Sequence, residues 1–102
     1  MPQSFIIKSE VFEGPLDILL SLVEKRKLFI NDIALAKVTD DFINHIQNFD
    51  KLPMEDSASF ILIASTLLLI KSKSLLPALT LTEEEEVEIH DLETRLKIYQ
   101  RI

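Results

Sequence analysis

The run FILIASTLLLI, residues 60–70, constrains the fold of this chain more than any other feature. It contains no charged residue, and Ser65 and Thr66 are its only hydroxyl side chains. Eleven residues make about three helical turns, so its apolar side chains point in nearly every direction. Such a helix is buried on more than one side. We expect it to be the central helix of a bundle, or to pack both on its own domain and on a partner.

Three amphipathic segments accompany this central helix. The first segment begins at Pro15 and ends at the basic residues 25–27. Its apolar stripe runs from Leu16 to Val23. The second, near 33–49, follows the N-cap candidate Asn31. The central helix itself begins at Pro53 and stops at the LLP of residues 75–77. The last begins after Thr82, which has capping-box spacing to Glu85, and extends to the end of the chain.

Residues 5–12, FIIKSEVF, favour a short extended strand instead. Leu28-Phe29-Ile30 is the only other short extended candidate, and pairing between the two is weakly specified. Gly14, the single glycine, marks the expected hinge between the first strand and the first helix. The predicted fold class is therefore mainly α, a small bundle of about four helices with a short N-terminal β-strand.

Composition excludes several classes of function. One glycine rules out Gly-rich phosphate loops, and the absence of cysteine excludes disulfides and thiolate metal sites. His45 and His90 stand isolated, without a neighbouring nucleophile and orienting group. Four consecutive glutamates at 83–86 point in different directions on a helix and cannot converge on one ion. We therefore expect no enzyme, no catalytic residue, no metal site and no cofactor.

Charge and hydropathy restrict the partners further. The net charge of −6 does not suit broad contact with DNA or with anionic lipid. The longest apolar run is eleven residues, whereas a membrane-spanning helix needs about 20. No signal peptide is visible at the start. We expect a soluble protein that does not contact a membrane.

Four blocks of the sequence, in order, resemble segregation and condensation protein A (ScpA), the bacterial kleisin. VFEGPLDILL at 11–20 is similar to the family's FEGPLDLLL, and DIALAKVT at 32–39 is similar to DIPIAEIT. Residues 60–77 resemble FLVMAATLLEIKSRMLLP, and DLETRLKIY at 91–99 resembles the start of the family's middle region. Ala34 and Leu69 depart from the usual Pro and Glu. Together the blocks cover essentially the whole chain.

The resemblance implies a function in chromosome condensation and segregation. Kleisins of this family bridge SMC ATPase dimers and recruit an ScpB dimer, so contact with DNA would be indirect, through the complex, in the cytoplasm at the nucleoid. Residues 1–79 would form the N-terminal domain that binds the SMC coiled-coil neck. Residues 80–102 would be a linker and the start of the ScpB-binding middle region. The family's C-terminal winged-helix domain has no counterpart in these residues, so we expect a fragment or a truncated product.

Two binding surfaces follow from the resemblance as expectations. The SMC-neck surface would lie on the exposed sides of the second and third helices, where apolar residues recur at helical spacing. Its expected residues are Phe42, Ile46, Ile63, Thr66, Leu67 and Ile70, with Lys71 and Ser74. The ScpB-binding segment would begin with Leu92, Leu96 and Tyr99, a seam for which the sequence offers no obvious intramolecular counterpart.

Three alternatives remain at this point. A self-contained four-helix core would use the same apolar residues without any partner, because core and interface share one pattern. A self-associating protein would pair the central helix with that of a second copy. A helix-turn-helix DNA-binding regulator would need polar and basic side chains on its recognition helix, and residues 60–70 supply almost none.

Overall fold

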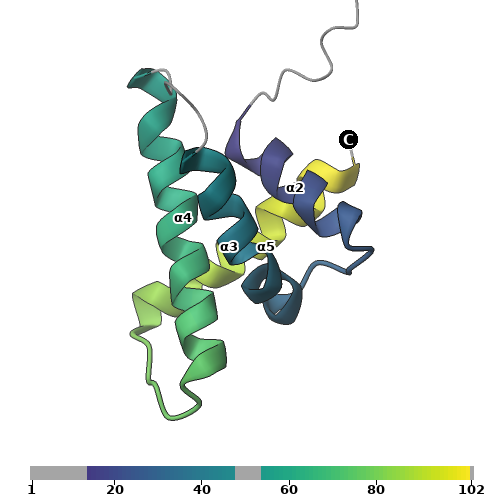
Figure 1. Ribbon diagram of the computed structural model, residues 1–102. Coiled ribbons are helices and arrows are strands. Elements are labelled where there is room, and N and C mark those ends of the chain that lie inside the picture. The colour runs from purple at the N-terminus through teal and green to yellow at the C-terminus, as the bar shows by residue number, and fades with distance from the viewer. Residues whose placement is uncertain (1–13, 48–53, 102) are drawn as a thin grey trace, which may run out of the picture.

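The computed structural model describes residues 14–47 and 54–101 (Figure 1). Within these ranges the chain forms four helices: α2 (Pro15–Lys25), α3 (Asp32–Gln47), α4 (Met54–Leu75) and α5 (Glu83–Arg101). The prediction of a mainly helical bundle is confirmed. The strand predicted at 5–12 lies outside the described residues. Leu28, Phe29 and Ile30 form no strand, and the described residues contain none.

One hydrophobic core joins all four helices. Each helix contributes a leucine that is completely buried: Leu19, Leu35, Leu67 and Leu96. The stripe predicted for α2 is confirmed on its inner side, where Val23 is also fully buried. Because the last of these leucines comes from α5, that helix is part of the same core as the first three.

The most extensive helix packing in the bundle is between α3 and α4. The rings of Phe42 and Phe60 stack with centroids 6.3 Å apart, within the range of favourable aromatic pairs. Beside them the buried hydroxyl of Thr39 lies 2.8 Å from the carbonyl oxygen of Leu35 and 3.3 Å from that of Leu67. These contacts fix α3 along the inner side of α4.

Both ends of α2 follow local rules. Pro15 occupies the first helical position, where its missing N–H has no acceptor to lose. At the other end the N–H of Lys27 donates to the Glu24 carbonyl and that of Leu28 to the Val23 carbonyl. This is a Schellman motif, and it places Lys27 at φ 58°, a conformation that glycine usually adopts.

Gly14 does not need to be glycine for steric reasons. Its φ of 174° is extended backbone that any residue adopts, and a Cβ built on it would meet nothing within 4 Å. The hinge predicted here therefore does not depend on the absence of a side chain in this structure.

Two predicted helix starts are confirmed by their hydrogen bonds. The Ala34 N–H donates to Oδ1 of Asn31 over 2.8 Å, so Asn31 caps α3. At α5 the Glu85 N–H donates to the Thr82 hydroxyl over 3.1 Å, and the Thr82 N–H donates to Glu85 Oε1 over 2.9 Å. This reciprocal pair is a complete capping box.

The length of α4 corrects the membrane argument made from the run at 60–70. The stretch Ser57–Leu75 is long and apolar enough to cross a membrane, by length and composition alone. In the structure, however, it contacts α2, α3 and α5, and Ile63 and Leu67 are almost completely shielded from solvent. One side of α4 is therefore part of the core of the bundle, while Ile61, Leu62 and Leu68 on its other side are exposed, so within this chain the helix is not buried on every side.

Candidate helix-binding surface

A row of residues along α4 faces away from the other three helices. Figure 1 shows α4 at the edge of the bundle, with α2 and α3 to one side of it and α5 crossing behind it. The row has alternating spacings of four and three and consists of Ile61, Ser65, Leu68, Ser72 and Leu75. We call it the outer stripe. This 3.5-residue repeat is the one by which helices pack in coiled coils.

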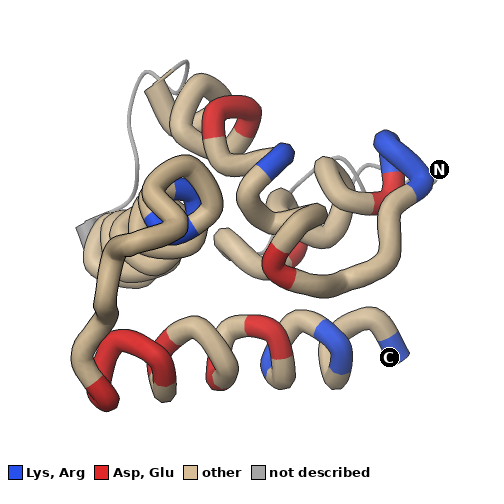
Figure 2. The backbone as a smooth tube through the Cα atoms, turned by 90° about the horizontal axis from the view of Figure 1, so that it is seen from below, with Lys and Arg blue, Asp and Glu red and all other residues tan. Residues whose placement is uncertain are grey.

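The outer stripe is apolar and accessible. Ile61 is 64% exposed, Leu68 49% and Leu75 67%, and Leu62 beside them is 54% exposed. The Ser65 hydroxyl donates to the Ile61 carbonyl of its own helix over 2.9 Å, so it requires no partner from outside. From Ser57 to Ile70 no charged residue occurs, whereas α5 carries charges along its whole length (Figure 2). Apolar surface of this kind is typical of interaction sites.

Charged groups border the stripe at its C-terminal end. Lys71 Nζ lies 2.6 Å from Asp40 Oδ2 on α3, and Lys73 Nζ lies 3.1 Å from Glu86 on α5. Leu68 also lines a shallow groove with Ile43 of α3. The stripe is therefore an apolar strip with an ion pair on each side of one end.

The structure places most of the predicted SMC-neck residues in the core, one on α3 and four on the side of α4 opposite this stripe. Five of them are at most 4% exposed: Phe42, Ile63, Thr66, Leu67 and Ile70. The expectation that they lie on exposed sides of their helices is wrong. On α4, these residues belong to the row that faces the core, on the other side of the helix from the outer stripe. Of the remaining three, Ile46 and Lys71 are half-buried and Ser74 is exposed.

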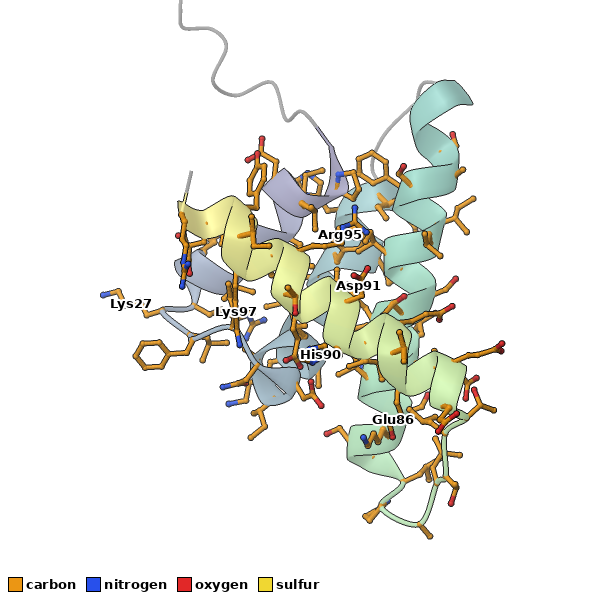
Figure 3. The ribbon with its side chains drawn as sticks, turned by 180° about the vertical axis from the view of Figure 1, so that it is seen from behind. Lys27, Glu86, His90, Asp91, Arg95 and Lys97 are labelled. Atoms are coloured by element: carbon orange, nitrogen blue, oxygen red, sulfur yellow. The ribbon has the colours of Figure 1, made fainter. Side chains whose placement is uncertain are left out.

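The seam of α5, formed by Ile89, Leu92 and Leu96, is also buried. Each of the three is at most 4% exposed, so the expectation that this seam lacks an intramolecular counterpart is wrong. Tyr99 is half-buried and lines a pocket with Pro15 and Leu16 of α2 and Leu62 of α4. Figure 3 shows α5 crossing both helices, with Glu86 at one end of α4 and Arg95 nearer its middle.

Two further exposed apolar residues escaped the sequence analysis. Phe29 is 87% and Ile33 69% exposed, at the turn into α3. Nothing in their spacing distinguishes them from core residues. The sequence analysis did not identify the outer stripe either, although the heptad phase that Ser65 and Ser72 share with Ile61 and Leu68 is a signal for it.

Among the described residues, no group of three or more acidic or histidine side chains could hold a metal ion. His45 lies on α3 and the exposed His90 on α5, far apart in sequence and on different helices. Among the described residues, the surface best suited to binding is therefore the apolar outer stripe, which could pack against another helix.

Comparison with known families matches residues 22–102 to the model of segregation and condensation protein ScpA. The chain belongs to the ScpA family. The resemblance to this family is thereby confirmed. The match includes the blocks at 32–39, 60–77 and 91–99, and with them α3, α4 and α5, while the block at 11–20 lies before it.

Individual relatives bear the same name, segregation and condensation protein A. The protein of Clostridium tetani is 42% identical over 81 residues, which are 79% of this chain and 32% of the relative. That of Exiguobacterium sibiricum is 33% identical over 100 residues, 98% of this chain and 40% of the relative. That of Streptococcus pyogenes serotype M1 is 38% identical over 95 residues, 93% of this chain and 40% of the relative. The chain thus spans well under half the length of these relatives. No solved structure matches it significantly.

Proposed function

We propose that this chain is a non-enzymatic kleisin segment that acts in chromosome condensation and segregation by binding the coiled-coil neck of an SMC ATPase. One observation carries the proposal: α4 presents a charge-free stripe with coiled-coil spacing to solvent. Membership of the ScpA family supports it, because the names of the relatives state that biological role. Such a protein works in the cytoplasm at the nucleoid and reaches DNA through its partners.

Helix packing explains how the stripe would work. A partner coiled coil offers apolar side chains at the same 3.5-residue spacing, so its knobs fit between Ile61, Leu68 and Leu75. The small Ser65 and Ser72 between them let the helix axes approach closely. Complete burial of one Leu or Ile is worth about 1.5–3 kcal/mol. Part of that gain is offset by the cost of association, so a few residues set the affinity.

The residues predicted for the neck surface take different parts in this proposal. Lys71 lies at the rim and Ile46 at the border of α3, where they contact the partner's flank. Ser74 lies one turn beyond the buried Ile70, on the inner side of α4 near Ile33, and takes no part in the outer stripe. The five buried residues, Phe42, Ile63, Thr66, Leu67 and Ile70, support α4 from beneath and hold the outer stripe straight. Their substitution would weaken binding only by weakening the fold.

We further propose that the segment beginning with Leu92, Leu96 and Tyr99 binds an ScpB dimer. The family match through residue 102 supports a function for α5 beyond the first three helices. The capping box gives α5 a defined helical start of its own.

Self-association is the second candidate function, since the same exposed stripe would pair with that of a second copy. The outer stripe does not favour the helix-turn-helix alternative, because its only polar side chains are Ser65 and Ser72 and it carries no cation for phosphates.

The test compares substitutions on two exposed faces. Ile61→Asp and Leu68→Asp place a charge on the outer stripe, and Ile98→Asp places one on the outer side of α5, where the side chain is 56% exposed. Binding to an SMC head-plus-neck fragment from the same organism is measured by calorimetry, and folding by circular dichroism. We expect both α4 variants to remain folded and lose binding, while the α5 variant binds normally.

Two outcomes would contradict the proposal. Folded α4 variants that bind the SMC fragment as tightly as the parent chain would remove the stripe from the interface. If light scattering instead shows that the parent is a dimer and that Leu68→Asp makes it a monomer without changing SMC binding, self-association is the function of the stripe.

A further inference from the structure

The apolar seam of α5 is already occupied within the chain. Ile89, Leu92 and Leu96 are its core-facing residues, and all are buried. Apart from the half-buried Tyr99, the other apolar side chains of this helix, Val87 and Ile98, are exposed on its outer side. A partner that needs Leu92 and Leu96 therefore cannot reach them while α5 lies on the bundle.

α5 crosses α4 at a steep angle, with its start near the end of α4 (Figures 1 and 2). Near its start Glu86 pairs with Lys73, close to the end of α4. Near its end Arg95 and Tyr99 line one pocket with Ser59 and Leu62, two turns into α4. The seam consequently lies along the α4 stretch between these points, with α2 on its other flank.

Two surface contacts link the ends of α5 to its neighbours. The ion pair of Glu86 with Lys73 is exposed to solvent, with both side chains at least 40% accessible. At the far end Gln100 Nε2 lies 3.4 Å from Glu24 Oε2 on α2, also at the surface. Exposed pairs of this kind contribute little to stability. Docking of α5 therefore depends mainly on the burial of its three seam residues and on the half-buried Tyr99.

α5 also has the means to remain a helix when it leaves the bundle. Its capping box is internal to residues 82–85, and Asp91 pairs with Arg95 one turn along the same helix. Acidic residues gather at its start and basic ones toward its end, which favours the helix dipole (Figure 2). It is joined to α4 by residues 76–82, of which 76–80 are exposed.

We propose that docking of α5 on α2 and α4 is an autoinhibitory contact that competes with ScpB for the same seam. This inference rests on the ScpB role proposed above. The chain then exists in a docked form, which binds SMC through the outer stripe, and an undocked form, which also presents the seam. The apparent affinity for ScpB is reduced by the fraction of chains that are undocked.

A cross-link that holds the far end of α5 tests the competition. The chain contains no cysteine, so Glu24→Cys with Gln100→Cys supplies its only two thiols. A bis-maleimide with a disulfide in its spacer joins α2 to α5 and is cleaved by a reductant. The matched control joins α2 to α3 through Arg26→Cys with Asp41→Cys, at an exposed ion pair with a 2.6 Å separation. Calorimetry measures ScpB and SMC binding before and after cleavage of the spacer.

We expect the α2–α5 link to weaken ScpB binding about tenfold or more and cleavage to restore it. SMC binding should be unchanged, and the α2–α3 link should alter neither affinity. The variant Leu16→Ala, which trims the docking site on α2 and leaves the seam intact, should bind ScpB more tightly than the parent.

Equal ScpB affinity of the linked and cleaved forms would overturn the competition and leave the proposed ScpB role standing. If neither form binds ScpB, the proposed ScpB role fails and the competition with it. The SMC measurement on the same samples reports on the outer stripe independently.

Discussion

The hydroxyl oxygen of Thr39 on α3 lies 3.3 Å from the carbonyl oxygen of Leu67 on α4, and both residues are completely buried. The same hydroxyl lies 2.8 Å from the Leu35 carbonyl within its own helix, so one proton serves two acceptors. A threonine on the inner side of an amphipathic helix is thereby satisfied without water, and it ties α3 to α4 at their closest approach.

The variant Thr39→Val should destabilise the bundle. Valine has nearly the same shape as threonine but cannot donate to either carbonyl, so we expect a loss of about 1 kcal/mol in the free energy of unfolding. Urea denaturation followed by circular dichroism measures it. Thr94→Val, on the exposed side of α5, is the control and should change stability little. Equal stability of the Thr39 variant and the parent would show that the hydroxyl contributes nothing.

Leu96→Ala should cost much more than Ile98→Ala, although the two residues are neighbours on α5. Leu96 is completely buried whereas Ile98 is 56% exposed. Removal of a buried leucine side chain costs about 2–5 kcal/mol, and a surface substitution changes stability by about 0.5 kcal/mol or less. Thermal and urea unfolding of both variants measures the difference. Similar small effects would mean that α5 is not part of the folded core.

Lys27→Gly should stabilise the protein. Lys27 has a φ of 58°, where a side chain costs about 1–2 kcal/mol. Glycine removes this cost but loses about 0.5–1 kcal/mol through the greater freedom of the unfolded chain. We therefore expect a net gain of some tenths of a kcal/mol up to about 1 kcal/mol. Lys25→Gly, inside α2, is the control and should destabilise by about 1 kcal/mol. A loss at both positions would contradict the Schellman geometry.

SMC binding through the outer stripe should depend weakly on salt. The stripe carries no charge between Ser57 and Ile70, and the ion pairs at its end are already formed within the chain. Raising the salt concentration from 0.1 to 0.5 M should therefore change the dissociation constant by only about twofold. Titration calorimetry at several salt concentrations measures it. A steep loss of affinity would indicate a surface dominated by charge instead.

The sequence predicts the helices of this protein well because their signals are local. Asn31 and Thr82 indicate helix starts because each can cap a helix through a hydrogen bond with the residue three positions later. Both capping interactions are present in the structure. The inner stripes of α2 and α3 follow from their spacing, since each has a clear polar side. Lys27 was not foreseen, because nothing in its neighbours requires a left-handed conformation there.

The rotation of α4 about its own axis could not be predicted in the same way. Ile61 and Ile63 are chemically identical neighbours in an apolar run, yet one is 64% exposed and the other 3%. Only the positions of α3 and α5 decide which of them faces inward, and those positions depend on contacts distant in sequence. The seam of α5 was misplaced for the same reason, since its counterpart on α2 is distant in sequence.

Gly14 and Tyr99 line one pocket, so the chain enters the folded unit and leaves it at the same corner. Tension applied through whatever precedes and follows the unit would pass directly between the start of α2 and the end of α5. Ser59 and Leu62 of α4 line the same pocket, so such a pull would also reach the first turns of α4. A partner held near Ile61, at the start of the outer stripe, would therefore be sensitive to tension between the two ends of the folded unit.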